Sequence, residues 1–273
     1  MHDNTYTGKL QKIASLDDPR VAVYRNMPDR TLRGEEIFVA EGRLLTHRVL
    51  ESKFQVESVF MTPEYIGEVD WFNRTDVPIF VAEESLMLEI VGFKFHHGIM
   101  AAGCRPAETS LETLLPPPEH CRRLRLVVCP EITKPENMGL IFRAAAGLGA
   151  DAILLGERCC DPFSRRALRV SMGTVLTMPF RKASSLVEDL RPLRERWHVE
   201  LFAAVLDAQA EPLDNIVWPE RAGVMIGNEF DGLGQNWIDL CQRTVTIPMA
   251  RQTDSLNLGV AAGIILYEMT RKR

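Results

Sequence analysis

Uninterrupted apolar runs recur through the second half of the chain, and they limit what it can fold into. Strands that are apolar at every position are buried on both faces, as happens when helices cover both sides of a parallel sheet. Potential helices alternate with these runs. The second half is therefore predicted to be an α/β domain with a parallel sheet, whose strands are LRLVVCP, DAILLG, ELFAAVLD, AGVMIGNE and RTVTIPM.

The first hundred residues show the same alternation on a smaller scale. Short apolar runs such as EEIFVAEG and VPIFVAEE end in turn or capping residues, and helical patterns such as GRLLTHRVLES lie between them. Three consecutive prolines follow at 116–118, which neither a helix nor a central strand accepts. Because 273 residues is long for one hydrophobic core, we predict a small α/β domain over 1–105, a linker over 106–122 and a larger domain over 123–273.

Composition argues against several classes of protein. No apolar run approaches the roughly 20 residues of a membrane span, and the start, MHDNTYTGKLQK, resembles neither a signal nor a transit peptide. A cytoplasmic protein is therefore expected. The 6 cysteines form no CxxC pair and His96-His97 have no suitably spaced cysteine, so we expect reduced thiols and no metal site. The net charge of −5 argues against indiscriminate coating of nucleic acid but allows a local basic groove.

The stretch KPENMGLIFRAAAGLG combines a helix start with one conspicuous cation. Pro135 is expected to stop the preceding strand, and Asn137 is a favourable helix N-cap. Small residues let the helix lie close to the sheet, and Arg143 stands out among them. Taken alone, this pattern also fits a capped helix with a solvated arginine.

The stretch VMIGNEFDGLG places an acidic residue after a glycine. The strand runs into Gly227, where bare backbone can approach a ligand, and then meets Glu229. Taken alone, a glycine-rich turn between strand and helix explains it equally well.

The third stretch, IPMARQTDSLNLGVAAGIILYEM, passes from a strand into a glycine- and alanine-rich helix. Ser255 is expected to cap a helix beginning near Leu256, with Asn257 in its first turn. Two glycines inside the helix cost roughly 1 kcal/mol each relative to alanine, which close packing would explain. We therefore expect Ser255 and Asn257 at the lip of a pocket whose walls are backbone.

Taken in order, the three stretches resemble the motifs of the SpoU (TrmH) family of RNA ribose methyltransferases, part of the knotted SPOUT superfamily. They stand here as NMGLIFRAA, GNEFDGL and IPMARQTDSLN. The resemblance covers the second domain and extends more weakly to the first, where FVAEGRLLTHRVLES and FKFHHGIMAAG are similar to a ribosomal-protein-like α/β substrate-binding domain. Two positions depart from the family pattern, because Phe230 and Arg251 stand where glycine is usual.

The resemblance implies a trefoil-knotted C-terminal domain, a homodimer, S-adenosylmethionine as cofactor, and methylation of a ribose 2′-hydroxyl in structured RNA without a metal. By motif position, backbone groups near Gly227, Ile247 and Leu256 would hold the cofactor's adenosine. Arg143 matches the family's essential arginine. It would grip the adjacent phosphate and stabilise an alkoxide-like transition state, with action as a base left open.

The remaining motif residues are given supporting roles by the resemblance. Asn137, Ser255 and Asn257 would orient ribose and phosphate or hold the loops. Glu229 would anchor the knot or orient Arg143.

Two other classes of function compete with RNA methylation. A Rossmann enzyme needs a glycine-rich turn after its first strand, and VVCPEITKPENMG supplies none. A non-catalytic RNA-binding relative has no reason to keep all five polar motif residues together. Ribosomal RNA is favoured over transfer RNA because the first domain resembles those that recognise structured ribosomal RNA loops, and its candidate RNA contacts are Arg43, Arg48, Lys53, Lys94, His96 and His97.

Overall fold

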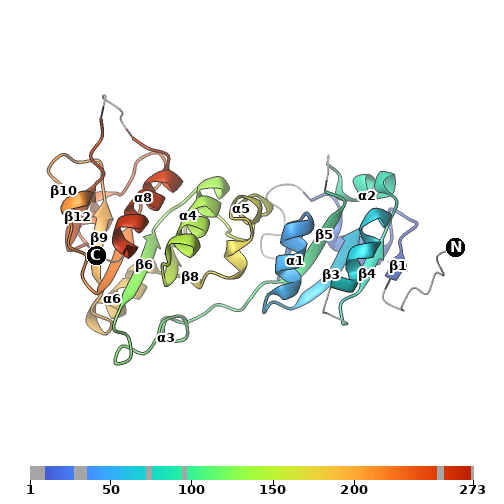
Figure 1. Cartoon of the computed structure of the whole chain (residues 1–273), viewed down its shortest axis with the longest axis horizontal. Helices are drawn as coiled ribbons and strands as arrows, with labels where there is room; N and C mark the ends of the chain where they lie inside the picture. Colours follow the sequence, from blue (N-terminus) through green and yellow to red (C-terminus); the bar gives the residue numbers. More distant parts are fainter. Residues whose placement is uncertain (1–9, 28–35, 72–75, 94–96, 251–254, 272–273) are drawn as a thin grey trace. The chain divides into compact units, whose positions relative to one another are not determined.

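The computed structural model of the chain describes residues 10–27, 36–71, 76–93, 97–250 and 255–271 (Figure 1). The chain forms two compact units, and each has its own sheet. The first unit comprises Met1–Pro106 together with Phe163–Leu176, and the second comprises Ala107–Pro162 together with Thr177–Arg273. The division near residue 106 lies next to the predicted end of the smaller domain, but the second unit is not one continuous stretch.

The first unit contains a mixed five-stranded sheet in the order β1-β4-β3-β5-β2. The pairs β1–β4 and β3–β4 are parallel, whereas β5 pairs antiparallel with both β2 and β3. The strands are β1 (Leu10–Lys12), β2 (Ile37–Glu41), β3 (Val56–Met61), β4 (Ile79–Val81) and β5 (Ile99–Cys104). The helices of residues 1–106 are η1 (Pro19–Tyr24), α1 (Arg43–Glu51), η2 (Pro63–Trp71) and α2 (Glu84–Val91).

A segment from the second half of the chain completes the first unit. It carries α5 (Arg165–Val170) and η3 (Thr174–Leu176), and α5 packs against β2. The Phe163 ring stacks on Phe38 with centroids 5.0 Å apart. The Arg165 guanidinium pairs with the Glu41 carboxylate, which is almost fully buried. These buried contacts explain why residues 163–176 leave the domain that we predicted to run unbroken over 123–273.

The second unit is built on a seven-stranded sheet in the order β10-β12-β9-β11-β6-β7-β8, and each neighbouring pair is parallel. The predicted α/β class with a parallel sheet is confirmed. The five apolar runs form β6 (Leu124–Cys129), β7 (Ala152–Leu155), β9 (Glu200–Ala204), β11 (Arg221–Met225) and β12 (Arg243–Thr246). Two shorter strands, which the runs did not predict, lie at the edges of the sheet: β8 (Phe180–Lys182) and β10 (Glu211–Pro212).

Two long helices of the second unit, α4 (Pro135–Leu148) and α8 (Leu258–Thr270), lie side by side (Figure 1). A Cβ atom at Gly259 would lie 2.5 Å from the Cβ of Leu140, so only glycine allows this approach. At Gly263 the nearest atom would be 4.0 Å away. Close packing therefore explains why residue 259 is a glycine, but it does not explain Gly263, where a side chain would fit. The other helices are α3 (Leu111–Leu114), α6 (Leu186–Glu195), η4 (Leu213–Asn215) and α7 (Gln235–Ile238).

The predicted linker over 106–122 differs from the structure. Leu111 and Leu115 are buried in the core of the second unit, in the same cluster as Trp197. The Trp197 indole donates a hydrogen bond of 2.9 Å to the carbonyl of Pro116. The proline-rich stretch is therefore packed on the second unit, because the leucines beside the prolines supply enough apolar surface to hold it there.

Within the part of the chain that the structure describes, no helix combines the length and the apolar character needed to cross a membrane.

Candidate functional site

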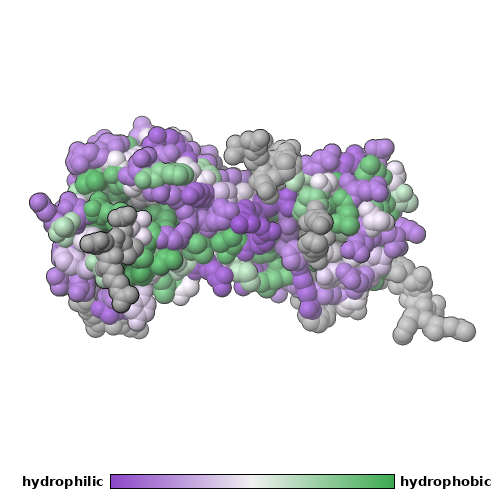
Figure 2. Space-filling model, turned by 90° about the horizontal axis from the view of Figure 1, so that it is seen from above, coloured by the Kyte–Doolittle hydropathy of each residue, from purple (hydrophilic) through white to green (hydrophobic). Residues whose placement is uncertain are grey.

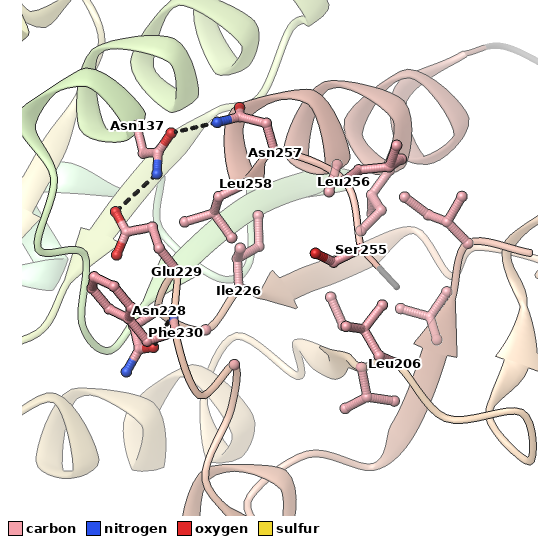
Figure 3. A pocket seen from close by; sticks show the side chains of 18 of the residues that line it. Asn137, Leu206, Ile226, Asn228, Glu229, Phe230, Ser255, Leu256, Asn257 and Leu258 are labelled. Atoms are coloured by element: carbon pink, nitrogen blue, oxygen red, sulfur yellow. Dashed lines mark hydrogen bonds between the residues drawn. The ribbon is translucent and has the colours of Figure 1, made fainter. Parts of the chain in front are cut away.

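A cavity of about 380 Å³ lies at the carboxyl ends of three adjacent strands of the second unit (Figure 3). Residues just after β9, β11 and β12 line it, together with the segment that leads into α8. Ligands of open α/β sheets bind at the carboxyl ends of the strands, near the point where the strand order reverses. The cavity is lined by Lys134, Asn137, Ala204, Val205, Leu206, Ile226, Gly227, Asn228, Glu229, Phe230, Gly232, Val245, Ile247, Met249, Ser255, Leu256, Asn257, Leu258, Ala261 and Ile265.

A chain of hydrogen bonds joins the three motif stretches beside this cavity (Figure 3). The Nδ2 atom of Asn137 donates to Oε1 of Glu229 at 2.9 Å. The Nδ2 atom of Asn257 donates to Oδ1 of Asn137 at 3.1 Å. The Asn137 side chain is buried, since the residue is only 4 % exposed. Both ends of its amide group are hydrogen-bonded to side chains of the other two motifs.

Asn257 is the N-cap of α8, which corrects the expected role of Ser255. The Oδ1 atom of Asn257 accepts hydrogen bonds from the backbone N–H groups of Gly259, at 3.0 Å, and Val260, at 3.3 Å. The helix begins at Leu258, so the exposed Ser255 lies outside it and lines the cavity. Both residue types favour N-caps, and the bond to Asn137 holds Asn257 in that place.

Asn137 is not the N-cap that we expected, and Pro135 does not end a strand. The α4 helix begins at Pro135, where the missing N–H removes no helical hydrogen bond. Lys134 occupies the N-cap position without a side-chain capping bond, and Asn137 lies in the first turn. Strand β6 has already ended at Cys129, before Pro130.

The Glu229 carboxylate accepts four hydrogen bonds. Its Oε2 atom accepts from the backbone N–H of Thr133 at 3.3 Å and from the Thr133 hydroxyl at 2.9 Å. Its Oε1 atom accepts from the Lys134 N–H at 3.0 Å as well as from Asn137. Partial burial raises the pKa of Glu229, but these donors outweigh it and hold the pKa below its ordinary value. The carboxylate therefore ties the loop before α4 to the loop after β11.

Arg143 lies apart from this network. It is exposed on α4 and is not among the residues that line the cavity. Within the described residues its guanidinium makes no ion pair or hydrogen bond. The partners of Glu229 are Thr133, Lys134 and Asn137, so the alternative in which Glu229 orients Arg143 is not what the structure contains.

The predicted cofactor residues Gly227, Ile247 and Leu256 all line the cavity. A Cβ atom at Gly227 would lie 2.1 Å from the carbonyl carbon of Gly232, so the chain can fold back here only over a bare backbone. The Asn228 N–H donates to the Gly232 carbonyl at 3.0 Å and closes this turn.

Sequence reasoning missed the wall contributed by β9. Ala204, the last residue of that strand, lines the cavity together with Val205 and Leu206, which follow it. They carry no motif. The signal that would have found them is the strand order, which places β9 between β11 and β12.

Neither a disulfide nor a metal-binding cluster is found among the residues that the structure describes. The six cysteines are unpaired. Burial raises the pKa of Cys159 to about 11 and that of Cys160 to about 12, so both are thiols at neutral pH. In the ranges that the structure covers, no group of three His, Cys, Asp or Glu side chains could hold a metal ion.

The candidate RNA contacts of the first unit differ in how they are held. Arg43 pairs with the Glu68 carboxylate at 2.8 Å, and the Arg48 guanidinium donates to the Met172 carbonyl. Lys53 and His97 are exposed. Lys94 and His96 lie outside the described residues, as does Arg251 of the third motif.

Comparison with known proteins decides the family. The profile of the SpoU rRNA Methylase family matches residues 125–267. An uncharacterised tRNA/rRNA methyltransferase of Mycobacterium tuberculosis is 32% identical over 96% of this chain and 92% of its own length. The chain belongs to the SpoU rRNA methylase family. The family predicted from the three motifs is thereby confirmed.

Two further proteins are similar to this chain. A 23S rRNA (guanosine-2′-O-)-methyltransferase of Acinetobacter baylyi is 29% identical over 70% of this chain and 77% of that protein. The crystal structure of an AdoMet-bound rRNA methyltransferase from Sinorhizobium meliloti superposes with a TM-score of 0.80, at 23% identity, over 96% of this chain and 98% of its own. The likeness to that structure establishes a shared fold along nearly the whole chain.

Proposed function

We propose that this SpoU protein transfers a methyl group from S-adenosylmethionine to a ribose 2′-hydroxyl in structured RNA, with ribosomal RNA as the favoured substrate. The observation that carries the proposal is the hydrogen-bonded chain Glu229–Asn137–Asn257, which joins all three family motifs beside one cavity. A relative that had lost catalysis would have no need to keep this chain intact. Binding without catalysis remains the rival function.

The cavity fits the proposed cofactor. Its volume of about 380 Å³ lies within the range of small-molecule pockets. Ile226, Ile247 and Leu256 offer apolar surface for an adenine ring, and the bare backbone at Gly227 offers N–H and C=O groups. When bound, S-adenosylmethionine supplies a methyl group on an electrophilic sulfonium. No metal is required for that chemistry.

The chain's own residues have two tasks in this reaction. One is to place the ribose 2′-oxygen in line with the methyl group, and Ser255 and Asn257 at the cavity lip suit that task. The other is to stabilise the developing negative charge on that oxygen. A guanidinium stays protonated at neutral pH, so we assign Arg143 to the adjacent phosphate and to this charge rather than to proton removal. Its exposure on α4 leaves it accessible to RNA.

The knot and the homodimer belong to the proposal as well. The packing of α8 on α4 brings the third motif against the first, which is the contact that a threaded arrangement of the motif loops requires. Val260, Ile264 and Tyr267 form an exposed apolar stripe on α8 at helical spacing, which suits a contact with a second copy. Figure 2 shows hydrophobic residues gathered on the visible face of the second unit.

We assign RNA recognition to the first unit and catalysis to the second. The Acinetobacter relative is named for 23S rRNA, whereas the Mycobacterium relative is named for both tRNA and rRNA. The name of the Acinetobacter relative favours ribosomal RNA as the substrate, and transfer RNA is the alternative. Since the whole chain is net acidic, RNA binding requires a local basic face and should weaken as salt is added.

Isothermal titration with S-adenosylmethionine, followed by transfer of labelled methyl groups to RNA, tests the proposal. The full chain should bind the cofactor and methylate RNA prepared from a strain that lacks it. Binding of RNA without cofactor binding or methyl transfer would establish the non-catalytic alternative.

A further inference from the structure

Phe230 is an exposed aromatic ring at the rim of the cavity. The residue is 72% exposed, although it lines the cavity that holds the motif side chains. Figure 3 shows Phe230 at the edge of the pocket. A large apolar side chain at the mouth of a binding pocket gains free energy only when something covers it.

Hydrogen bonds fix the loop that carries this ring. The backbone N–H groups of Phe230 and Asp231 both donate to Oδ1 of Asn228, at 2.8 and 2.7 Å. The bond between Asn228 and Gly232 closes the same turn. Glu229 anchors the loop to the residues before α4. The ring is therefore presented from a preorganised loop.

A cation lies over the same ring. The Nζ atom of Lys134 is 4.8 Å from the centroid of Phe230, and Lys134 also lines the cavity. Its backbone N–H is bound to Glu229, so one carboxylate holds both sides of the pair in place. An aromatic face beside an ammonium group matches the two parts of a nucleotide, because bases stack on aromatic rings and phosphates attract cations.

We propose that Phe230 is a stacking platform for a nucleobase of the RNA substrate, beside the ribose that is methylated. The proposal rests on the proposed function. A nucleotide of structured RNA must leave its own stack before its ribose can reach a cavity, and an aromatic ring replaces part of the stacking that is lost. The ring has no hydrogen-bonding group, so it contributes affinity and position rather than a preference for one base. The rival occupant is a second copy of this chain.

Substitutions of Phe230 separate these possibilities in the full-length protein. The variants are Phe230→Ala, Phe230→Leu, which keeps apolar bulk, and Phe230→Tyr and Phe230→Trp, which keep an aromatic face. Val187→Ala is the control, because Val187 is also exposed and apolar but lies on α6, outside the cavity. Methyl transfer is measured on total RNA from a strain that lacks the protein, cofactor affinity by titration, and oligomeric state by light scattering.

Base–aromatic stacking contributes about 5- to 150-fold in affinity per base. We therefore expect the Ala and Leu variants to lose that factor in kcat/KM for RNA, mainly through KM, with cofactor affinity and oligomeric state unchanged. The Tyr and Trp variants should stay within about threefold of wild type, as should the control.

Several results would overturn the stacking role while the proposed function stands. One is an Ala variant as active as an active wild type. Another is an equal loss of kcat/KM in the aromatic variants and in the Ala variant. The third is an Ala variant that binds the cofactor more weakly but has an unchanged KM for RNA. Dissociation of the Ala variant into smaller species would assign the ring to a contact between copies. A wild-type protein that methylates no RNA would overturn the proposed function, and the platform with it.

Discussion

Asn137→Asp should turn the central hydrogen bond of the site into a repulsion between like charges. The Nδ2 atom of Asn137 lies 2.9 Å from Oε1 of Glu229, and aspartate would put an oxygen in its place. The bond accepted from Asn257 would be kept, since an oxygen remains at that end. Repulsion makes it costly to ionise the second of two carboxylates this close, and such pairs separate their pKa values by about 3 units.

The expected cost follows from that separation. Each unit of pKa corresponds to about 1.4 kcal/mol, so the variant should lose about 4 kcal/mol of unfolding free energy at neutral pH. Because the pKa of the folded pair is raised, the loss is full above the raised pKa and shrinks as pH falls toward the ordinary carboxylate range. The wild type behaves in the opposite sense, because the pKa of Glu229 is lowered in the folded protein. The stability that the Glu229 carboxylate contributes is therefore present above the ordinary carboxylate pKa range and is lost as the pH falls below that range.

Urea unfolding at pH 7.5 and pH 5, followed by tryptophan fluorescence, measures both effects. Trp197, Trp218 and Trp237 all belong to the second unit and report on it. Asn215→Asp is the matched control, because it adds the same charge at an exposed position of η4. A loss of less than about 1 kcal/mol at pH 7.5, or a loss that does not shrink at pH 5, would refute the contact between Asn137 and Glu229.

Three further changes test other parts of the site. Arg143→Ala should nearly abolish methyl transfer while cofactor affinity is kept, and retention of more than about a tenth of wild-type kcat would correspond to less than ~1.4 kcal/mol and remove this residue from the mechanism. Gly227→Ala should raise the cofactor Kd or unfold the loop, because the added Cβ atom would lie 2.1 Å from the backbone of Gly232. Gly147→Ala on α4 is its control, because a Cβ atom there meets open space. Thermal unfolding should show that this control stabilises the protein by up to ~1 kcal/mol. Truncation before Ile247 removes α8 and should give insoluble protein; a soluble, folded truncation would contradict the threaded arrangement.

The strands of the second unit could be predicted because their burial is complete. Every residue of β6 and of β7 is buried. Strand β7 is an unbroken apolar run, and β6 is interrupted only by Arg125, whose guanidinium donates hydrogen bonds to the backbone carbonyls of Met269 and Pro219. Strands β8 and β10 have three and two residues and lie at the edges of the sheet, where short segments with polar residues leave no such pattern.

The motifs point to polar residues that the structure brings to the cavity, Asn137, Glu229, Ser255 and Asn257, but they do not reveal the hydrogen-bond partners of these residues or the position of Arg143 outside the cavity. Ser255 and Asn257 are both good caps, and they stand two positions apart. What decides between them is a hydrogen bond from Asn257 to Asn137, which is 120 residues away in the chain. The predicted cap on Ser255 was wrong because local preference cannot register such a contact.

The excursion of residues 163–176 into the first unit shows the same limit. Phe163 stacks on Phe38, and Arg165 pairs with Glu41. Each partner lies more than a hundred residues earlier in the sequence. A consequence for experiments is that deleting the first 105 residues would also expose the surface that packs on them, so the proposed division of labour is better tested with point variants of the first unit.

Mapping of 2′-O-methylated nucleotides in total RNA tests the central claim most directly. Cells that produce the wild-type protein are compared with cells that lack it and with cells that produce the Arg143→Ala variant. The account predicts that a 2′-O-methyl group on ribosomal RNA is missing from the second and third strains and present in the first. A modification map that is identical in all three strains would contradict it.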